Sequence, residues 1–339
     1  MSNEDFWAVI EEGEDYYDEG DYESALDRFD RAVNLSPSNA DAHNSRGNAL
    51  MMLGRHEDAL GSFEQALRLD AGFVKASLNR AELLVDYLGR SKEGEEVSRH
   101  LLKRPLDLYD AADAYFVLAK AALGAGDLRA AVSMTDKALG LSPARAEFTS
   151  LRGGILFEQG NYRKALAEFD KVVKQLPDDA DIHYRRGLVL EKLGRDADAG
   201  AAFARAAEMD PEHYPLPAEI SVEECERIID EVIQSFEPEV HRFIENVTIQ
   251  VEDFASRRIV SEDNVSPQVL GLFVGTPYQE KTSIAQATGP DVILIFRKSL
   301  EKIAGNREEL VDEIRKTLLH EVGHYLGFEE HELHDLGFG

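Results

Sequence analysis

The chain has 339 residues, which is long enough for two or three domains. Its 65 acidic and 37 basic residues leave a formal net charge of −28. Nucleic acids and anionic membranes attract proteins through positive charge, so we expect neither as a partner.

The cysteine content and the apolar segments narrow the class of protein further. The single cysteine, Cys225, excludes an internal disulfide framework and a zinc finger with several cysteines. The first residues lack the basic and apolar regions of a signal peptide, and no apolar run approaches 18 residues. The sequence therefore predicts a cytoplasmic protein.

A ladder of small and aromatic residues repeats through the first 211 residues. Pro143, Pro177 and Pro211 follow one another at intervals of 34. The second copy of the ladder consists of Gly47, Leu50, Gly54, Ala59, Phe63 and Ala66. The same spacing starts again at Gly13 and at Gly187, and a degenerate copy occupies about 75–110. A fixed period of this length is typical of stacked helical hairpins.

Each position of the ladder has a physical role in such a hairpin. Gly47 allows two helices to approach closely, and Gly54 ends the first helix in a left-handed cap. Phe63, on the second helix, is expected to pack back onto the first.

The ladder resembles the tetratricopeptide repeat. The resemblance implies an α-helical solenoid of about six units over residues 1–211, whose concave groove binds a protein or peptide partner. The net charge favours a basic or neutral partner. Asn44 and Asn48 match only part of the pattern that clamps a C-terminal carboxylate, so we do not predict a clamp.

The composition changes after the array. Pro211, Pro215 and Pro217 predict a stiff linker over residues 212–219. Beyond it, the pattern predicts a small α+β domain over residues 220–339. Its expected helices are 221–237, 297–304 and 308–326, its expected strands are 247–251, 269–274 and 291–296, and 330–339 is expected to be a short tail.

The helix expected at 308–326 carries the sequence His320-Glu321-Val322-Gly323-His324. Histidines at positions i and i+4 project from one face of a helix, so both can bind one Zn²⁺ ion. Glu321 is placed to accept a proton from a zinc-bound water molecule and to pass it to the leaving amine. Gly327 lets the chain turn back and supply a third ligand. Glu330 ranks first for that role, with His331 and His334 as alternatives.

The segment from 318 onward resembles the minimal bacterial zincin-like metallopeptidases, which end shortly after an HExxHxxGxxD/E motif. This resemblance covers about residues 220–339 and implies a zinc-dependent peptidase fold with an edge strand that aligns a peptide substrate. It also implies that Glu330 occupies the position of the acidic third ligand, where Asp is commoner.

The leading hypothesis is a zinc metallopeptidase that hydrolyses peptide bonds by Glu321-assisted attack of a zinc-bound water, while the repeats recruit a protein partner or substrate. The alternative is a non-catalytic interaction scaffold whose zinc site is structural or vestigial. An open coordination position supports catalysis, whereas a fourth protein ligand supports a closed structural site.

Overall fold

The computed structural model describes residues 3–236, 238–245, 247–262, 265–280 and 291–335. The chain divides into two compact units, residues 1–155 and 156–339. None of the helices in the described ranges combines the length and the apolar character that a membrane crossing requires.

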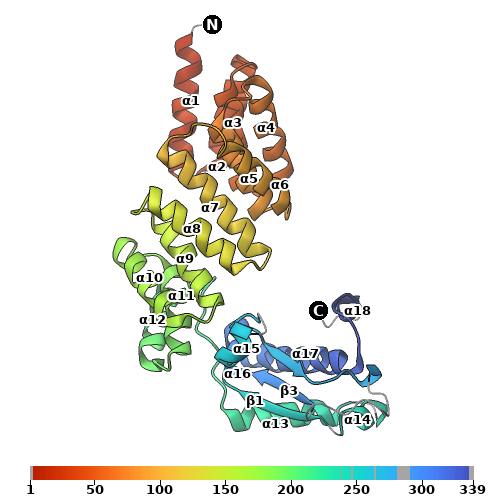
Figure 1. Ribbon diagram of the computed structural model, residues 1–339. Helices are drawn as coiled ribbons and strands as arrows, with labels where there is room; N and C mark the ends of the chain where they lie inside the picture. Colours follow the sequence, from red (N-terminus) through yellow and green to blue (C-terminus); the bar gives the residue numbers. More distant parts are fainter. Residues whose placement is uncertain (1–2, 237, 246, 263–264, 281–290, 336–339) are drawn as a thin grey trace. The chain divides into compact units, whose positions relative to one another are not determined.

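The N-terminal two-thirds of the chain is a series of helical hairpins (Figure 1). In the described part of the chain its helices are α1 (Asn3–Asp18), α2 (Tyr22–Leu35), α3 (Ala40–Met52), α4 (His56–Leu69), α5 (Val74–Asp86), α6 (Ser91–Leu101), α7 (Leu108–Gly124), α8 (Leu128–Leu141), α9 (Ala146–Glu158), α10 (Tyr162–Gln175), α11 (Ala180–Lys192) and α12 (Asp196–Met209). They form six consecutive pairs, as the repeat predicts.

The glycines of the ladder have the roles that the sequence predicts. Gly54 has a φ of 72°, the left-handed conformation that a glycine adopts without strain. A Cβ atom on Gly47 would lie 2.5 Å from Cε1 of Phe63, a distance that real contacts do not reach. The missing side chain of Gly47 therefore makes room for the buried Phe63 ring.

The C-terminal part of the second unit contains a small mixed sheet. Its strands are β1 (Thr248–Glu252), β2 (Gly271–Val274) and β3 (Val292–Phe296), in the order β1-β3-β2. Strand β3 is parallel to β1 and antiparallel to β2. The described helices of this part are α13 (Val222–Gln234), α14 (Pro238–Ile244), α15 (Arg257–Glu262), α16 (Arg297–Ile303), α17 (Arg307–Leu326) and α18 (Glu330–Asp335), with a 3-10 turn, η1 (Tyr278–Glu280).

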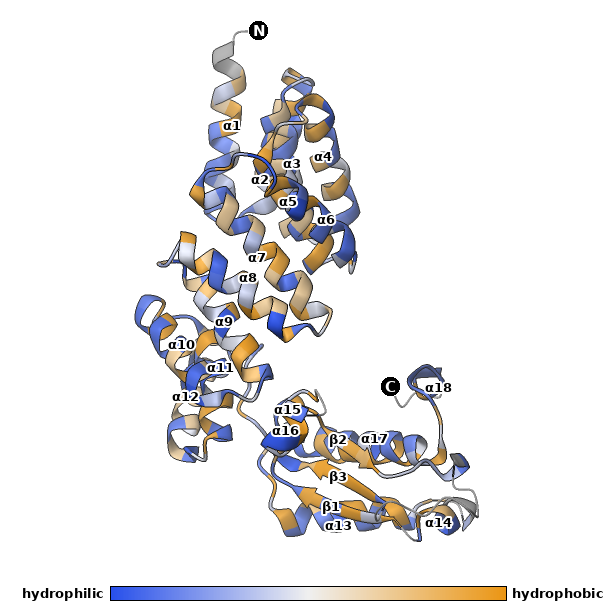
Figure 2. Ribbon diagram, in the orientation of Figure 1, coloured by the Kyte–Doolittle hydropathy of each residue, from blue (hydrophilic) through white to orange (hydrophobic). Residues whose placement is uncertain are grey.

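The central strand β3 buries both of its faces, because successive side chains of a strand point to opposite sides. Ile293 and Ile295 join a core with helices α13 and α17. Phe296 joins a second cluster with Ala255 and Val260, near helix α15. The strands are accordingly among the hydrophobic parts of this domain (Figure 2). The face of the sheet that carries Ile293 and Ile295 therefore packs against helix α17, which carries the two histidines.

The expected elements are present, with three differences. The sequence does not predict helices α14 and α15. It predicts a short tail over 330–339, whereas helix α18 occupies most of that segment. Helix α18 is short, with six residues, and its buried Leu333 packs against α17. One buried leucine is a weak signal in sequence, although it is enough to dock a short helix here.

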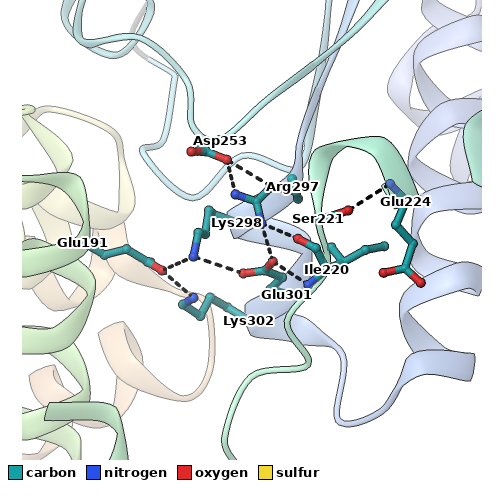
Figure 3. Close-up of polar contacts among 9 residues, drawn as sticks. All are labelled: Glu191, Ile220, Ser221, Glu224, Asp253, Arg297, Lys298, Glu301 and Lys302. Carbon is teal, nitrogen blue, oxygen red and sulfur yellow. Dashed lines mark hydrogen bonds and ion pairs between the residues drawn. The ribbon is translucent and has the colours of Figure 1, made fainter. Parts of the chain in front are cut away.

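Ion pairs within the second unit join helix α11 to helix α16 (Figure 3). The Nζ atom of Lys302 donates to Oε1 of Glu191 over 2.9 Å, and Lys298 lies 3.5 Å from the same oxygen. Glu191 and Lys302 are both buried, with side chains 6% and 8% exposed. Glu301, which also lies in α16, accepts hydrogen bonds from Arg297 and from the backbone N–H of Ile220.

Candidate metal centre

Helix α17 is capped at both ends by residues suited to that role. The side chain of Asn306 accepts a hydrogen bond from the backbone N–H of Glu309 over 3.0 Å, which caps the first turn. Acidic residues in that turn face the positive end of the helix dipole. The helix ends at Gly327, whose φ of 96° is left-handed. The chain turns there and returns as α18.

This turn brings the three first-ranked metal ligands together. The Nε2 atoms of His320 and His324 are 2.9 Å apart. Oε1 of Glu330, at the start of α18, lies 3.8 Å from Nε2 of His320 and 3.5 Å from Nε2 of His324. All three ligand atoms lie within 4.8 Å of one another, and no other such group of histidine, cysteine or carboxylate side chains occurs in the described ranges.

The chemistry of these donors fits a zinc ion. Two imidazole nitrogens and one carboxylate oxygen form a ligand set that leaves a position open on a tetrahedral ion. Nδ1 of His324 lies 3.2 Å from the carbonyl oxygen of Phe328. A proton on Nδ1 donated to that carbonyl leaves Nε2 with the lone pair that a metal requires. The 2.9 Å gap between the two Nε2 atoms is a few tenths of an ångström below the roughly 3.3 Å between two nitrogens on tetrahedral zinc.

The two alternative third ligands lie outside this group. Nδ1 of His331 is 3.8 Å from a carboxylate oxygen of Glu329, and its side chain is exposed. His334 is exposed as well. The six-residue helix α18 thus presents Glu330 to the two imidazoles, whereas its two histidines are not members of the cluster.

Glu321 lies next to the cluster and is buried. Its Oε2 atom accepts a hydrogen bond of 2.7 Å from the backbone N–H of Phe273 in strand β2. Burial raises the pKa of the Glu321 carboxyl to about 7, and the nearby charge of Glu330 acts in the same direction, while His320 and the Phe273 hydrogen bond oppose the increase. A carboxyl group with a pKa near neutrality can both accept and donate a proton at physiological pH.

Strand β2 approaches helix α17 closely because Gly271 has no side chain. A Cβ atom at this position would lie 2.9 Å from Cγ of Glu321 and 2.7 Å from Cγ2 of Thr317. The glycine therefore permits the contact that holds Glu321. Sequence reasoning marks Gly271 as part of a strand, but the role of the Phe273 N–H is missed, because a backbone donor leaves no signature in the residue type.

A cleft of about 420 Å³ opens beside these groups. Its walls come from strand β2, from the segment that follows it and from the turn after α17. The lining residues are Leu272, Phe273, Gly275, Pro277, Gln279, Glu321, His324, Gly327, Phe328 and Glu329. Among the described strands, β2 lies at one end of the sheet order.

Comparison with known proteins assigns both parts of the chain. A family model for zincin-like metallopeptidases matches residues 244–339, and one for tetratricopeptide repeats matches residues 10–72, 116–174 and 151–214. The human protein DnaJ homolog subfamily C member 7 is 28% identical over 211 residues, which are 60% of this chain and 43% of that protein. The chain therefore spans less than half the length of this relative.

Two further likenesses concern the repeats. The TPR repeat-containing thioredoxin TTL4 of Arabidopsis thaliana is 32% identical over 138 residues, which cover 39% of this chain and 20% of that protein. PilW, a type IV pilus biogenesis factor with a known crystal structure, is 19% identical in sequence to this chain. The structural match covers 62% of this chain and 96% of the PilW chain, with a TM-score of 0.55. This likeness shows the repeat fold. The chain combines a tetratricopeptide repeat array with a zincin-like metallopeptidase domain.

Proposed function

We propose that the C-terminal domain is a zinc-dependent peptidase. His320, His324 and Glu330 would hold the ion, and Glu321 would be the general base. The observation that carries the proposal is the convergence of three metal-binding side chains beside a buried carboxyl group. A bound zinc ion would supply Lewis acidity and lower the pKa of a water molecule.

The residues of the chain would do the remaining work. Glu321 would accept the proton of the attacking water and deliver it to the leaving amine. The Phe273 N–H holds one oxygen of this carboxylate and so fixes its orientation. A peptide substrate would lie in the cleft, with the carbonyl of the bond to be cleaved beside Glu321 and His324.

The test compares the full-length protein with its Glu321→Gln variant on a library of fluorogenic peptides, after zinc content has been measured in both. We expect one zinc per chain in both proteins and hydrolysis by the wild type alone. Glutamine retains an oxygen that accepts the Phe273 hydrogen bond but cannot take up the proton. Equal hydrolysis by the two proteins would contradict the proposal.

One observation favours a second candidate, a scaffold whose zinc site is structural. Glu321 is buried and already hydrogen-bonded to the backbone, as expected of a residue that supports a fold. If the full-length protein binds zinc through the three ligands but cleaves no peptide of the library, the structural role of the zinc site is favoured. Loss of stability on zinc removal would then be the main effect of the metal.

We further propose that the array binds a basic peptide. A groove of about 1000 Å³ in the first unit is lined mainly by helices α1, α3, α5 and α7. Its charged lining residues are Glu14, Asp41, Glu82, Asp107, Asp110, Asp113, Glu147, Lys75, Lys120 and Arg145. Two of the three cations are already neutralised, since Lys120 pairs with Glu82 and Arg145 with Asp113.

Apolar and amide groups in the same groove suit an extended chain. Trp7 and Tyr109 are 51% and 69% exposed and can cover aliphatic stems. Asn79 donates to Asn44 and Asn48 over 3.0 and 2.8 Å, so three amides are gathered at one point. Binding of a lysine-rich peptide to the full chain should weaken in an Asp110→Lys variant and in high salt. A glutamate-rich peptide of equal affinity would contradict this proposal.

A further inference from the structure

A second cavity, of about 550 Å³, lies within the second unit and has the opposite charge to the rest of the chain. It is lined by the turn into α10, by the end of α11 and by the segment that joins β1 to α15. The lining residues are Gly160, Asn161, Tyr162, Arg163, Lys164, Lys192, Leu193, Phe254, Ala255 and Arg257. Four of these are cations and none is a carboxylate, in a chain whose net charge is −28.

Three of the four cations have no acidic partner within the described residues. Arg163, Lys164 and Arg257 are exposed and form no ion pair there, in contrast to the paired cations of the neighbouring helix α16. Arg163 and Lys164 lie in the first turn of α10, where positive charge opposes the helix dipole. Their position therefore costs the fold some stability, and helix formation does not explain it.

Two features bring Arg257 and Lys192 to the same cavity. Gly160 has no side chain, and a Cβ atom there would lie 3.6 Å from Cγ of Arg257 and 3.5 Å from Val260, so helix α15 approaches the turn closely. The Nζ atom of Lys192 lies 3.7 Å from the centre of the Phe254 ring and donates to the carbonyl oxygen of Pro267 over 2.5 Å. Lys192 is thus held half-buried at one wall of the cavity.

Tyr162, one of the lining residues, carries a polar group without a partner. The hydroxyl oxygen of Tyr162 is buried and makes no hydrogen bond to any described residue. A buried hydroxyl normally has a hydrogen-bond partner, because leaving it unpaired costs about 1–3 kcal/mol.

We infer that this cavity binds the phosphate group of a small phosphorylated molecule, held by Arg163, Lys164, Lys192 and Arg257. Guanidinium groups bind phosphate oxygens in pairs, and lysine adds a point charge. The volume suits a small ligand rather than a nucleic acid. Because the ligand would contact both the last repeats and the C-terminal domain of the second unit, it would hold the two together.

The binding should also change the protonation of Lys192. Desolvation lowers the pKa of Lys192 to about 7, and the nearby charge of Lys302 acts in the same direction, while Glu191 and Glu158 oppose it. An anion beside Nζ favours the charged form, so binding near neutral pH should take up part of a proton. Calorimetry in buffers of different ionisation enthalpy measures this uptake.

The test uses the full chain and three probes: inorganic phosphate, pyrophosphate and adenosine monophosphate. We expect each to raise the melting temperature above that in sodium chloride of equal ionic strength. Tighter binding of adenosine monophosphate than of phosphate would show that the remainder of a small molecule also contacts the cavity. Equal affinities would assign the site to the phosphate group alone. A melting temperature that no probe raises above the chloride control would overturn the proposal.

Matched variants exclude a general effect of charge. Arg163→Glu with Lys164→Glu should weaken phosphate binding at least about tenfold, and acidic residues in the first turn also favour the helix, so the variant should fold. Lys174→Glu changes an exposed residue near the other end of α10 and should leave the affinity unchanged. Arg257→Gln tests the same site from α15. If phosphate affinity falls by the same factor per altered charge in the Lys174 variant and in the double variant, the proposal of a local site is contradicted.

Discussion

Leu333 in helix α18 packs against Gly323 in helix α17, at the point where a side chain on Gly323 would overlap it. Gly323 lies between the two histidines of the motif, and Leu333 is buried three residues after Glu330. This contact is what fixes the short helix that presents Glu330 to His320 and His324. The glycine of the motif therefore has a structural role in the third ligand's position.

Gly323→Ala should displace Leu333 and with it Glu330. We expect zinc affinity to fall by about tenfold, the lower end of the effects seen for groups that orient metal ligands. Competition with a chromogenic chelator measures it. Gly200→Ala is the control, because a Cβ atom there has nothing within 4 Å. Unchanged affinity in the Gly323 variant would show that α18 does not orient the ligand.

The zinc ligands can be separated from the neighbouring histidines by substitution. His320→Ala, His324→Ala and Glu330→Gln should each reduce bound zinc below one ion per chain after dialysis. His331→Ala and His334→Ala should leave it unchanged, since neither side chain belongs to the cluster. Elemental analysis of the purified proteins gives the answer. Zinc lost in the His334 variant would favour a closed site with a fourth protein ligand.

Glu321→Gln should keep zinc and lose turnover. General acid–base catalysis contributes about 10²–10⁴ in rate, so kcat should fall by at least about a hundredfold. Because glutamine can still accept the Phe273 hydrogen bond, the melting temperature should change little. A second variant, Thr317→Ser, alters the same face of α17 without touching the proton path. Similar losses of kcat in both variants would point to a packing defect instead.

The pair Glu191 and Lys302 should matter more for stability than an exposed pair on the same helix. Both groups are buried, so Glu191→Ala leaves an uncompensated charge, which costs about 3–5 kcal/mol. Arg185→Ala breaks the exposed pair with Asp181 and should cost at most about 1 kcal/mol. Chemical denaturation of the full chain, followed by fluorescence, compares the two. Equal costs would mean that water reaches the buried pair.

The sequence predicts the parts of this protein that repeat or that carry a compact motif. The 34-residue ladder predicts the array, because each hairpin must bury the same face against its neighbour. The two histidines and Gly327 predict the metal helix and the turn after it. Helices α14 and α15 have six or seven residues each, which is too short for a periodic pattern to be seen.

The remaining features depend on contacts between distant segments. The hydrogen bond from Phe273 to Glu321 joins residues 48 apart in the sequence and uses a backbone donor. The cationic cavity joins Arg163 and Arg257, which are 94 residues apart in the sequence and meet only because the fold brings the start of α10 and α15 together. No local pattern encodes either arrangement, because tertiary packing determines both.

Lys192 should make stability depend on pH in a defined direction. Its pKa is about 7 in the folded chain and about 10.4 in an unfolded one, so between these values the unfolded state binds more protons. The contribution of Lys192 to the free energy of unfolding therefore rises with pH from about 7 to 10, with a slope of up to about 1.4 kcal/mol per pH unit. Lys192→Met should remove this slope, whereas Lys174→Met, at an exposed position, should keep it. Denaturation curves at pH 7, 8 and 9 measure the difference between the two variants. Parallel pH profiles would show that the Lys192 ammonium group remains solvated in the folded chain.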